Sequence, residues 1–276
     1  MKKQFLFFLF CLCAGVSNVW AQETDWSPLF PYVSEGITYT CENDENCPWE
    51  IVDGSLVSTN KAQSSKSTFT VTITCSNMVK LTMVSFTSSE SPDKIIIKLD
   101  GETRVEYGGE MTTWSSHYFV LTPGEHKMQV SYKKDGSVDR GQDLAKFGGI
   151  RLVDWEKEVT EIELSAPGQL GEEVVAAVGT LPQMESMRLK GTLNAEDWKT
   201  MKNLTGLEYL DMTETTVTEI PADAFTNNRI RVIKWPANLK VIGGKAFYGK
   251  SLMGHLVLPE TLDSIGPSAF YNNNID

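Results

Sequence analysis

Residues 242–250 read IGGKAFYGK, and residues 265–273 read IGPSAFYNN, so nearly the same phrase occurs twice at a spacing of 23 residues. A fixed period of this length is typical of solenoids, in which each repeat is one small structural unit. A single unit cannot bury its own apolar side, and stacked copies bury a continuous core between neighbours. The phrase therefore predicts a repeat array at the C-terminal end of this sequence.

Three tracks of apolar residues extend the same period upstream of the quoted phrase. Each unit has the pattern apolar-x-x-apolar-x-apolar, which is the strand signature of a leucine-rich repeat. A second apolar half follows in the later units, with Ile220, Ile242 and Ile265 ahead of Phe225, Phe247 and Phe270. We interpret all of these residues as core. The three strand tracks are Met184, Leu207, Ile230 and Met253; Met187, Leu210, Ile233 and Leu256; and Leu189, Met212, Trp235 and Leu258.

The stretches 239–247 and 262–270 match the phrase L-x-x-I-G-x-x-A-F and resemble BspA-like leucine-rich repeats of Bacteroides and Treponema surface antigens. The resemblance implies a short right-handed solenoid in a secreted or cell-surface protein, with a helical N-terminal cap. Residues 170–179 and a helix from the N-cap Asn194 through Met201 are expected to form that cap. Candidate ligand contacts on the strand face are Arg188, Lys190, Tyr209, Asp211, Lys234 and His255.

Residues 22–155 have a different pattern, in which short β-rich runs alternate with turn signals such as SSESPD, TPGE and KKDGS. This spacing favours an antiparallel β-sandwich. The segment resembles jelly-roll modules of the MAM-like and carbohydrate-binding kind. The fold class expected for the chain is mainly β with some α, with the repeats occupying residues 156–276. Six strands are expected, over residues 68–75, 79–87, 94–99, 116–121, 127–133 and 147–152.

The first residues predict export. Lys2 and Lys3 precede the apolar run FLFFLFCLCAG, and Ala21 ends a segment typical of a secretory signal peptide over residues 1–21. The formal net charge of −11 argues against nucleic acid, because such binders need a basic footprint. The expected location is the cell surface, the outer membrane or the medium.

Three cysteines follow the predicted cleavage site, and an exported protein can form disulfides. CENDENC closes a small loop, so a Cys41–Cys47 disulfide is predicted, with metal binding by that acidic loop as the alternative. Cys75 lies on the apolar face of a predicted strand and is expected to be a buried thiol, although pairing with Cys41 or Cys47 stays open.

The loop DGSVDRGQD raises the question of calcium. Its sixth and twelfth positions are Arg140 and Lys146, where an EF-hand needs Gly and Glu, so an EF-hand is rejected. A polar loop is favoured, and no cofactor is expected. A looser calcium site through Asp135, Asp139 and Asp143 is the alternative.

No motif of a known catalytic centre accompanies His117, His126 and His255, so the sequence does not predict an enzyme. Two binding functions follow instead. The first is adhesion, with the repeat array recognising a protein ligand such as a host surface or matrix protein. The alternative is a carbohydrate-binding sandwich carried on a repeat spacer. An uncapped edge at Leu256–Leu258, with no strand after Phe270, further predicts self-association through the C-terminal repeat.

Overall fold

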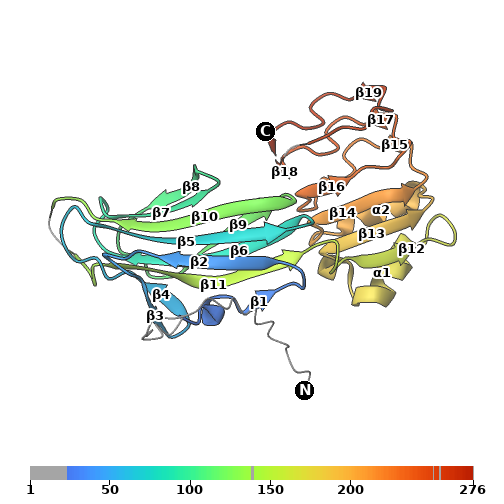
Figure 1. Ribbon diagram of the computed structural model, residues 1–276. Helices are drawn as coiled ribbons and strands as arrows, with labels where there is room; N and C mark the ends of the chain where they lie inside the picture. The colour runs from blue at the N-terminus through green and yellow to red at the C-terminus, as the bar shows by residue number, and fades with distance from the viewer. Residues whose placement is uncertain (1–23, 138–139, 251, 255, 276) are drawn as a thin grey trace, which may run out of the picture.

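The computed structural model describes residues 24–275 except 138–139, 251 and 255. Two β-rich parts follow one another along the chain, a sandwich and a stack of repeats (Figure 1). This confirms the mainly β fold class. The predicted signal peptide lies outside the described residues. Neither described α-helix has the length and apolar character that crossing a membrane requires.

Two antiparallel sheets form the sandwich. In the first sheet the strand order is β3-β4-β11-β6-β9, and β1 adds in parallel to β11. In the second sheet the order is β2-β5-β10-β7-β8. The first sheet comprises β1 (Tyr32–Val33), β3 (Glu50–Val52), β4 (Ser55–Val57), β6 (Val79–Ser88), β9 (Ser115–Leu121) and β11 (Leu144–Asp154). The second comprises β2 (Thr38–Asn43), β5 (Lys66–Cys75), β7 (Lys94–Leu99), β8 (Glu102–Tyr107) and β10 (Gly124–Lys133).

The sandwich core forms because alternate residues of each strand point inward. In β5, Phe69, Val71, Ile73 and Cys75 are buried, while threonines line the outer face. The Cys75 thiol lies 3.2 Å from the carbonyl of Thr122, to which it donates, and burial raises its pKa. The prediction that Cys75 is a buried thiol is therefore confirmed.

The predicted Cys41–Cys47 disulfide is wrong, because both residues are free thiols in the structure. Cys41 belongs to β2, opposite Val71 of β5, and burial raises its pKa to about 12. Cys47 lies in a turn that polar side chains close without a crosslink. In that turn the Asn43 side chain accepts from the Trp49 N–H and donates to the Trp49 carbonyl, both at 2.8 Å.

The repeats begin with a parallel sheet in the order β12-β13-β14-β16. Its strands are β12 (Thr160–Glu163), β13 (Ser186–Gly191), β14 (Tyr209–Thr215) and β16 (Val232–Lys234). The return segments carry a second parallel sheet of β15 (Glu219–Ile220), β17 (Val241–Ile242) and β19 (Ser264–Ile265). A last pair joins β18 (Met253–Gly254) to β20 (Asn274–Ile275). The expectation that no strand follows Phe270 is thus wrong.

Helices α1 (Leu170–Val178) and α2 (Ala195–Asn203) lie beside the first repeat strands (Figure 1). Asn194 caps α2 as expected. Its side chain accepts from the N–H groups of Glu196 and Asp197, while the Asp197 carboxylate accepts from the Asn194 N–H. This reciprocal arrangement satisfies donors that a helix start otherwise leaves unpaired.

The quoted phrase is explained by close stacking of the repeats. A Cβ on Gly243 would lie 2.3 Å from the Ala222 nitrogen, and a Cβ on Gly266 would lie 2.4 Å from the Gly244 nitrogen. Only glycine allows such an approach. The phenylalanine rings stack in a column, with centroids 4.7 Å apart for Phe225 and Phe247 and 5.4 Å apart for Phe247 and Phe270. The repeat phrase therefore encodes core packing.

Candidate functional site

The outward positions of the parallel sheet carry a row of alternating charges. Strand register places Glu161, Arg188, Asp211 and Lys234 side by side on β12, β13, β14 and β16. We call these four residues the charge row. Arg188 donates to Asp211 from Nε at 3.2 Å and to Glu161 from Nη1 at 3.1 Å. The structure thus brings three of the predicted contact residues together and adds Glu161.

The charge row is held in place by its own hydrogen bonds. Burial raises the pKa of Asp211, but hydrogen bonds from Thr213 and Arg188 outweigh burial and lower it overall. The bond to Asp211 in turn raises the pKa of Arg188. Lys190 lies one position further along the face, 3.2 Å from Glu161 and 3.6 Å from Glu214. This face therefore presents preorganised ion pairs, in which the Lys190 and Lys234 side chains are about a third exposed at most.

Tyr209, a predicted ligand contact, is not accessible on the strand face. Its side chain is fully buried, and its ring stacks on Trp155 at a centroid distance of 5.5 Å. Trp155 comes from the segment that links the sandwich to the repeats, so Tyr209 belongs to the contact between the two parts. The remaining candidate, His255, lies outside the residues that the structure describes.

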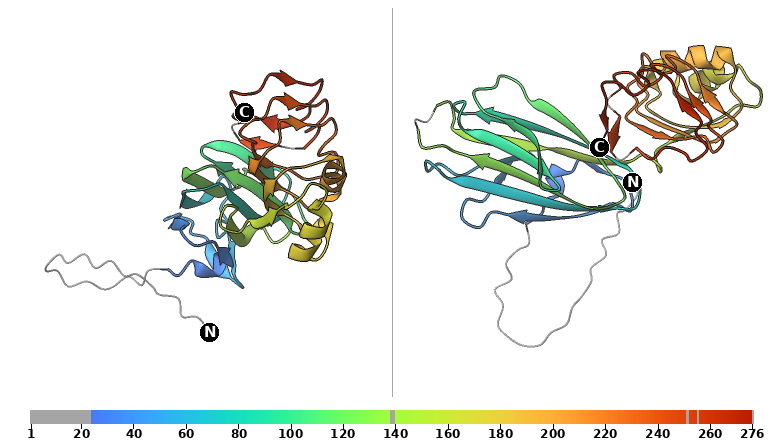
Figure 2. Two further views of the ribbon diagram at one scale, coloured as in Figure 1. Left: turned by 90° about the vertical axis from the view of Figure 1, so that its right-hand side faces the viewer. Right: turned by 90° about the horizontal axis from the view of Figure 1, so that it is seen from above.

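That contact joins the end of the sandwich to the leading edge of the repeat strands. Trp155, Tyr209 and Val232 form a small buried cluster, against which Met78, Tyr118 and Val120 of the sandwich pack. The Lys80 ammonium forms an ion pair with Glu208, and the Arg231 guanidinium lies 4.0 Å from the ring centre of Tyr118. We call this group the junction. Figure 2 shows the two parts meeting there at an angle.

Two hollows flank the junction. One has a volume of about 530 Å³ and a mixed-charge lining that includes Lys80, Arg151, Glu158 and Glu185. The other has about 420 Å³ and is lined mainly by apolar side chains of β16 and residues 256–259. Domain boundaries are a common place for binding sites. Neither hollow was predicted, because the sequence does not show which surfaces the two parts bring together.

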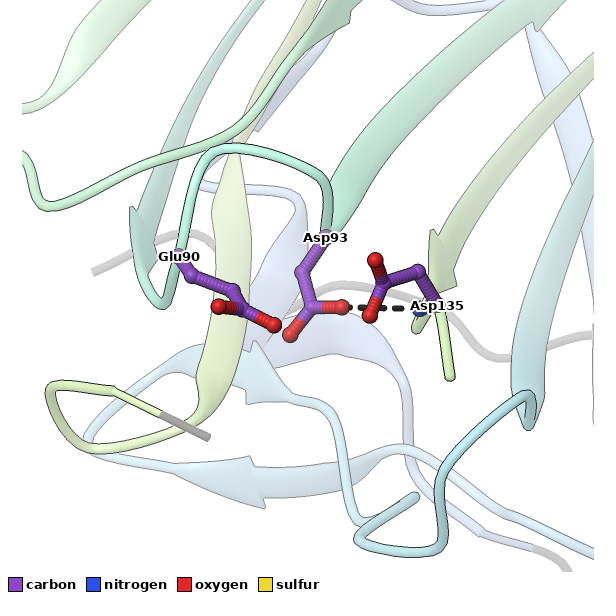
Figure 3. Close-up of side chains that lie close together, drawn as sticks. All are labelled: Glu90, Asp93 and Asp135. Atoms are coloured by element: carbon purple, nitrogen blue, oxygen red, sulfur yellow. Dashed lines mark hydrogen bonds between the residues drawn. The ribbon is translucent and has the colours of Figure 1, made fainter. Parts of the chain in front are cut away.

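The far end of the sandwich gathers acidic groups. Glu90, Asp93 and Asp135 each have a carboxylate oxygen within 4.8 Å of the others, and Figure 3 shows Glu90 and Asp93 on one loop beside Asp135, which comes from another segment. Asp93 accepts from the Asp135 N–H at 2.8 Å and from the Tyr132 hydroxyl at 3.3 Å. Hydrogen bonds from Ser137 lower the pKa of Asp135. Internal bonds thus account for this placement, although carboxylate oxygens are also the ligands calcium prefers.

Two of the three residues of the calcium alternative, Asp135 and Asp143, are described at this end. Asp143 lies in a buried ion pair with Lys134 and accepts from the Tyr132 hydroxyl at 3.3 Å. Asp139 lies outside the described residues. The partners of Asp135 are Glu90 and Asp93, which come from a different loop about 40 residues earlier. Only the SSESPD turn signal hinted at them, and it gave no indication of pairing.

A hollow of about 560 Å³ lies beside these carboxylates. Its lining is polar and comes from three loops. It includes Ser89, Glu90, Glu110 and Arg140. Trp114, which is 43% exposed and has its ring 5.7 Å from that of Phe86, is not among the residues that line this hollow.

The repeats match a known family model. Residues 182–276 match the model for the BspA type leucine rich repeat region, described as six copies, so these residues are BspA-type leucine-rich repeats. This confirms the resemblance found in the sequence. No curated protein matches the chain significantly.

Solved structures match part of the chain at low sequence identity and with TM-scores below 0.5. The secreted serine protease VesC from Vibrio cholerae is 14% identical with a TM-score of 0.37; the match covers 46% of this chain but only 26% of the protease. TmCBM61, solved with β-1,4-galactotriose, is 14% identical with a TM-score of 0.27, covering 42% of this chain and 88% of that one. A family 35 carbohydrate-binding module from Clostridium thermocellum is 12% identical with a TM-score of 0.23, covering 42% and 94%.

Proposed function

We propose that this chain is an exported binding protein, displayed at the cell surface or released, whose repeat array recognises a protein ligand. The observation that carries the proposal is the charge row together with Lys190, on a rigid parallel sheet of BspA-type repeats. Fixed charges of both signs select a partner with complementary charges and speed its association. Export rests on the sequence of residues 1–21.

Binding to an array of extracellular matrix and host surface proteins tests this proposal. Lys190→Glu reverses a charge on the strand face and is expected to weaken capture at least tenfold. Lys199→Glu is the matched control, because the Lys199 side chain is 70% exposed on α2 and forms an ion pair with Glu196 of the same helix. Equal loss in both variants, or none in either, would remove the strand face from recognition.

A second candidate is glycan binding by the sandwich. It is favoured by the polar hollow of about 560 Å³ among the far loops, where Arg140, Glu110 and the serines offer donors and acceptors for sugar hydroxyls. A glycan array with wild type and Arg140→Ala tests it, with and without calcium. Binding that Arg140→Ala abolishes and Lys190→Glu leaves intact would establish the second candidate.

A further inference from the structure

Both parts of the chain line one of the two hollows beside the junction. Its volume of about 530 Å³ is typical of a small-molecule site, and its lining is mainly polar. We call it the junction hollow. The sandwich contributes Lys80 and Arg151 to its lining, the linking segment contributes Glu158, and the repeats contribute Gln183, Glu185 and Ser186.

Arg151 brings a cation with unused donors into this hollow. Its guanidinium carbon lies 5.1 Å from the ring centre of Tyr32, in a cation–π contact. Across all the residues that the structure describes, no hydrogen bond or ion pair engages the Arg151 side chain. A cation–π contact uses the charge of a guanidinium and leaves its N–H donors, which fit the two oxygens of a carboxylate. Arg151 is therefore able to bind an acidic group.

The surroundings of Arg151 hold it in position without neutralising it. Tyr32 lies opposite Arg151 in the pairing of β1 with β11. The hydroxyls of Tyr32 and Ser34 both donate to Oε1 of Glu158, and the bond to Glu158 raises the pKa of Tyr32. Glu158 is thus directed to these hydroxyls, and the ring beside Arg151 is fixed. A cation supported in this way needs little reorganisation to bind a ligand.

Glu185 brings an acceptor to the repeat side of the hollow. It directly precedes β13, and its side chain is 70% exposed. Its one ion pair among the described residues is with the Lys80 ammonium at 3.9 Å, whereas Lys80 lies 2.5 Å from Glu208. So long a contact on an exposed side chain contributes little. The Glu185 carboxylate can therefore accept from a cationic group of a ligand.

Two uncharged groups of the lining also have unused hydrogen-bonding capacity. The Ser186 hydroxyl is buried and has no partner in the described structure, which is unfavourable for the protein alone. Oε1 of Gln183 accepts from the Thr180 hydroxyl at 3.0 Å, and no described group engages the Gln183 side-chain N–H donors. Such groups favour a ligand that carries both donors and acceptors between its charged ends.

We propose that the junction hollow binds a short peptide with free amino and carboxyl ends. The carboxylate of the peptide accepts from Arg151, its ammonium donates to Glu185, and its amide bonds to Gln183. The site uses neither the charge row nor Lys190, so the inference is independent of the proposed function. Since Arg151 belongs to the sandwich and Glu185 to the repeats, the bound peptide also bridges the two parts.

A pool of dipeptides with free ends, screened against the full chain by saturation-transfer NMR, tests the proposal. Calorimetry then compares the best binder with its C-terminal amide and with its N-acetyl derivative. Each derivative should bind at least tenfold more weakly, because each lacks one of the two charges. The free dipeptide should also raise the thermal unfolding midpoint of the chain, since it binds the folded state.

Arg151→Met should bind the free dipeptide at least tenfold more weakly than wild type and should no longer distinguish it from the amide. Arg104→Met is the matched control, because Arg104 is exposed on β8 and is not among the residues that line the hollow. Circular dichroism checks that both variants fold.

Glu185→Gln tests the other end of the site. This variant should bind the free dipeptide and its N-acetyl derivative equally, because the partner of the ammonium has lost its charge. Glu163→Gln is the matched control, since Glu163 is exposed on β12 and is likewise absent from the lining.

Several results would overturn the proposal. These are a pool in which no dipeptide binds, equal affinity of wild type and Arg151→Met, or an amide or N-acetyl derivative that binds wild type as tightly as the free dipeptide. Loss of matrix-protein capture in Lys190→Glu, with dipeptide binding unchanged, would leave both proposals standing. If the wild type captures no protein but binds the dipeptide as described, only the proposed function fails.

Discussion

Single residues of the repeat phrase have structural roles. Phe247 is fully buried in the phenylalanine column, between Phe225 and Phe270. Replacing Phe247 with Ala should lower the free energy of unfolding by about 3–5 kcal/mol, because the cavity cannot close fully. Tyr248→Ala is the control, since Tyr248 is 45% exposed. Urea denaturation measures both. Unchanged stability with lost ligand binding would show instead that Phe247 contacts the ligand.

His117 gives the sandwich a pH dependence. Its Nε2 lies 2.6 Å from the Ser85 hydroxyl, and burial lowers its pKa. Below the ordinary histidine pKa of about 6.5, the unfolded chain therefore binds more protons than the folded one. Stability should fall as pH falls through that value toward the folded-state pKa. Urea midpoints at pH 7.5 and 5.5 should differ less in His117→Gln than in wild type. Equal differences would refute the assignment.

At the scale of elements, the periodicity of apolar residues predicted most of the strands and both helices. All six expected sandwich strands appear, as do both helices, because apolar alternation and capping residues act locally. Strands β1, β2, β3, β4 and β8 were missed; the pairing of β1 with β11, for example, joins Tyr32 to Arg151, far apart in the sequence. The Cys41–Cys47 disulfide was predicted from the close spacing of the two residues, but spacing does not show which way each side chain points. Glu90 and Asp93 meet Asp135 only through the sandwich topology.

A row of side-chain hydrogen bonds, which we call the turn ladder, runs through the turns of successive repeats. Asn228, Lys250 and Asn273 occupy equivalent positions, and each donates to backbone carbonyls of stacked turns. Lys250 is a lysine where the other two repeats have asparagine. Its ammonium donates to the carbonyls of Thr226 and Asn228, and burial lowers its pKa. Lys250→Met should cost about 1–3 kcal/mol because buried carbonyls lose their donor. Lys250→Asn should stay within about 1 kcal/mol of wild type. Thermal denaturation that shows equal loss in both would contradict the turn ladder.

At the scale of the whole molecule, the junction holds the sandwich and the repeats together. Trp155 is 2% exposed and stacks on Tyr209, so Trp155→Ala should remove the centre of the contact. The variant is expected to unfold in two separate transitions and to show a larger radius of gyration in X-ray scattering, whereas Trp155→Phe should keep the compact form. An unchanged radius in Trp155→Ala would mean that Lys80–Glu208 and Arg231–Tyr118 suffice.

Hydrogen–deuterium exchange of the chain with and without a captured matrix protein tests the central claim, recognition through the repeats, most directly. The account predicts that the ligand slows exchange in β13, β14 and β16, with the far loops around Glu90, Asp135 and Arg140 unchanged. Slower exchange confined to those far loops, with the repeat strands unaffected, would contradict it and make the sandwich the binding part.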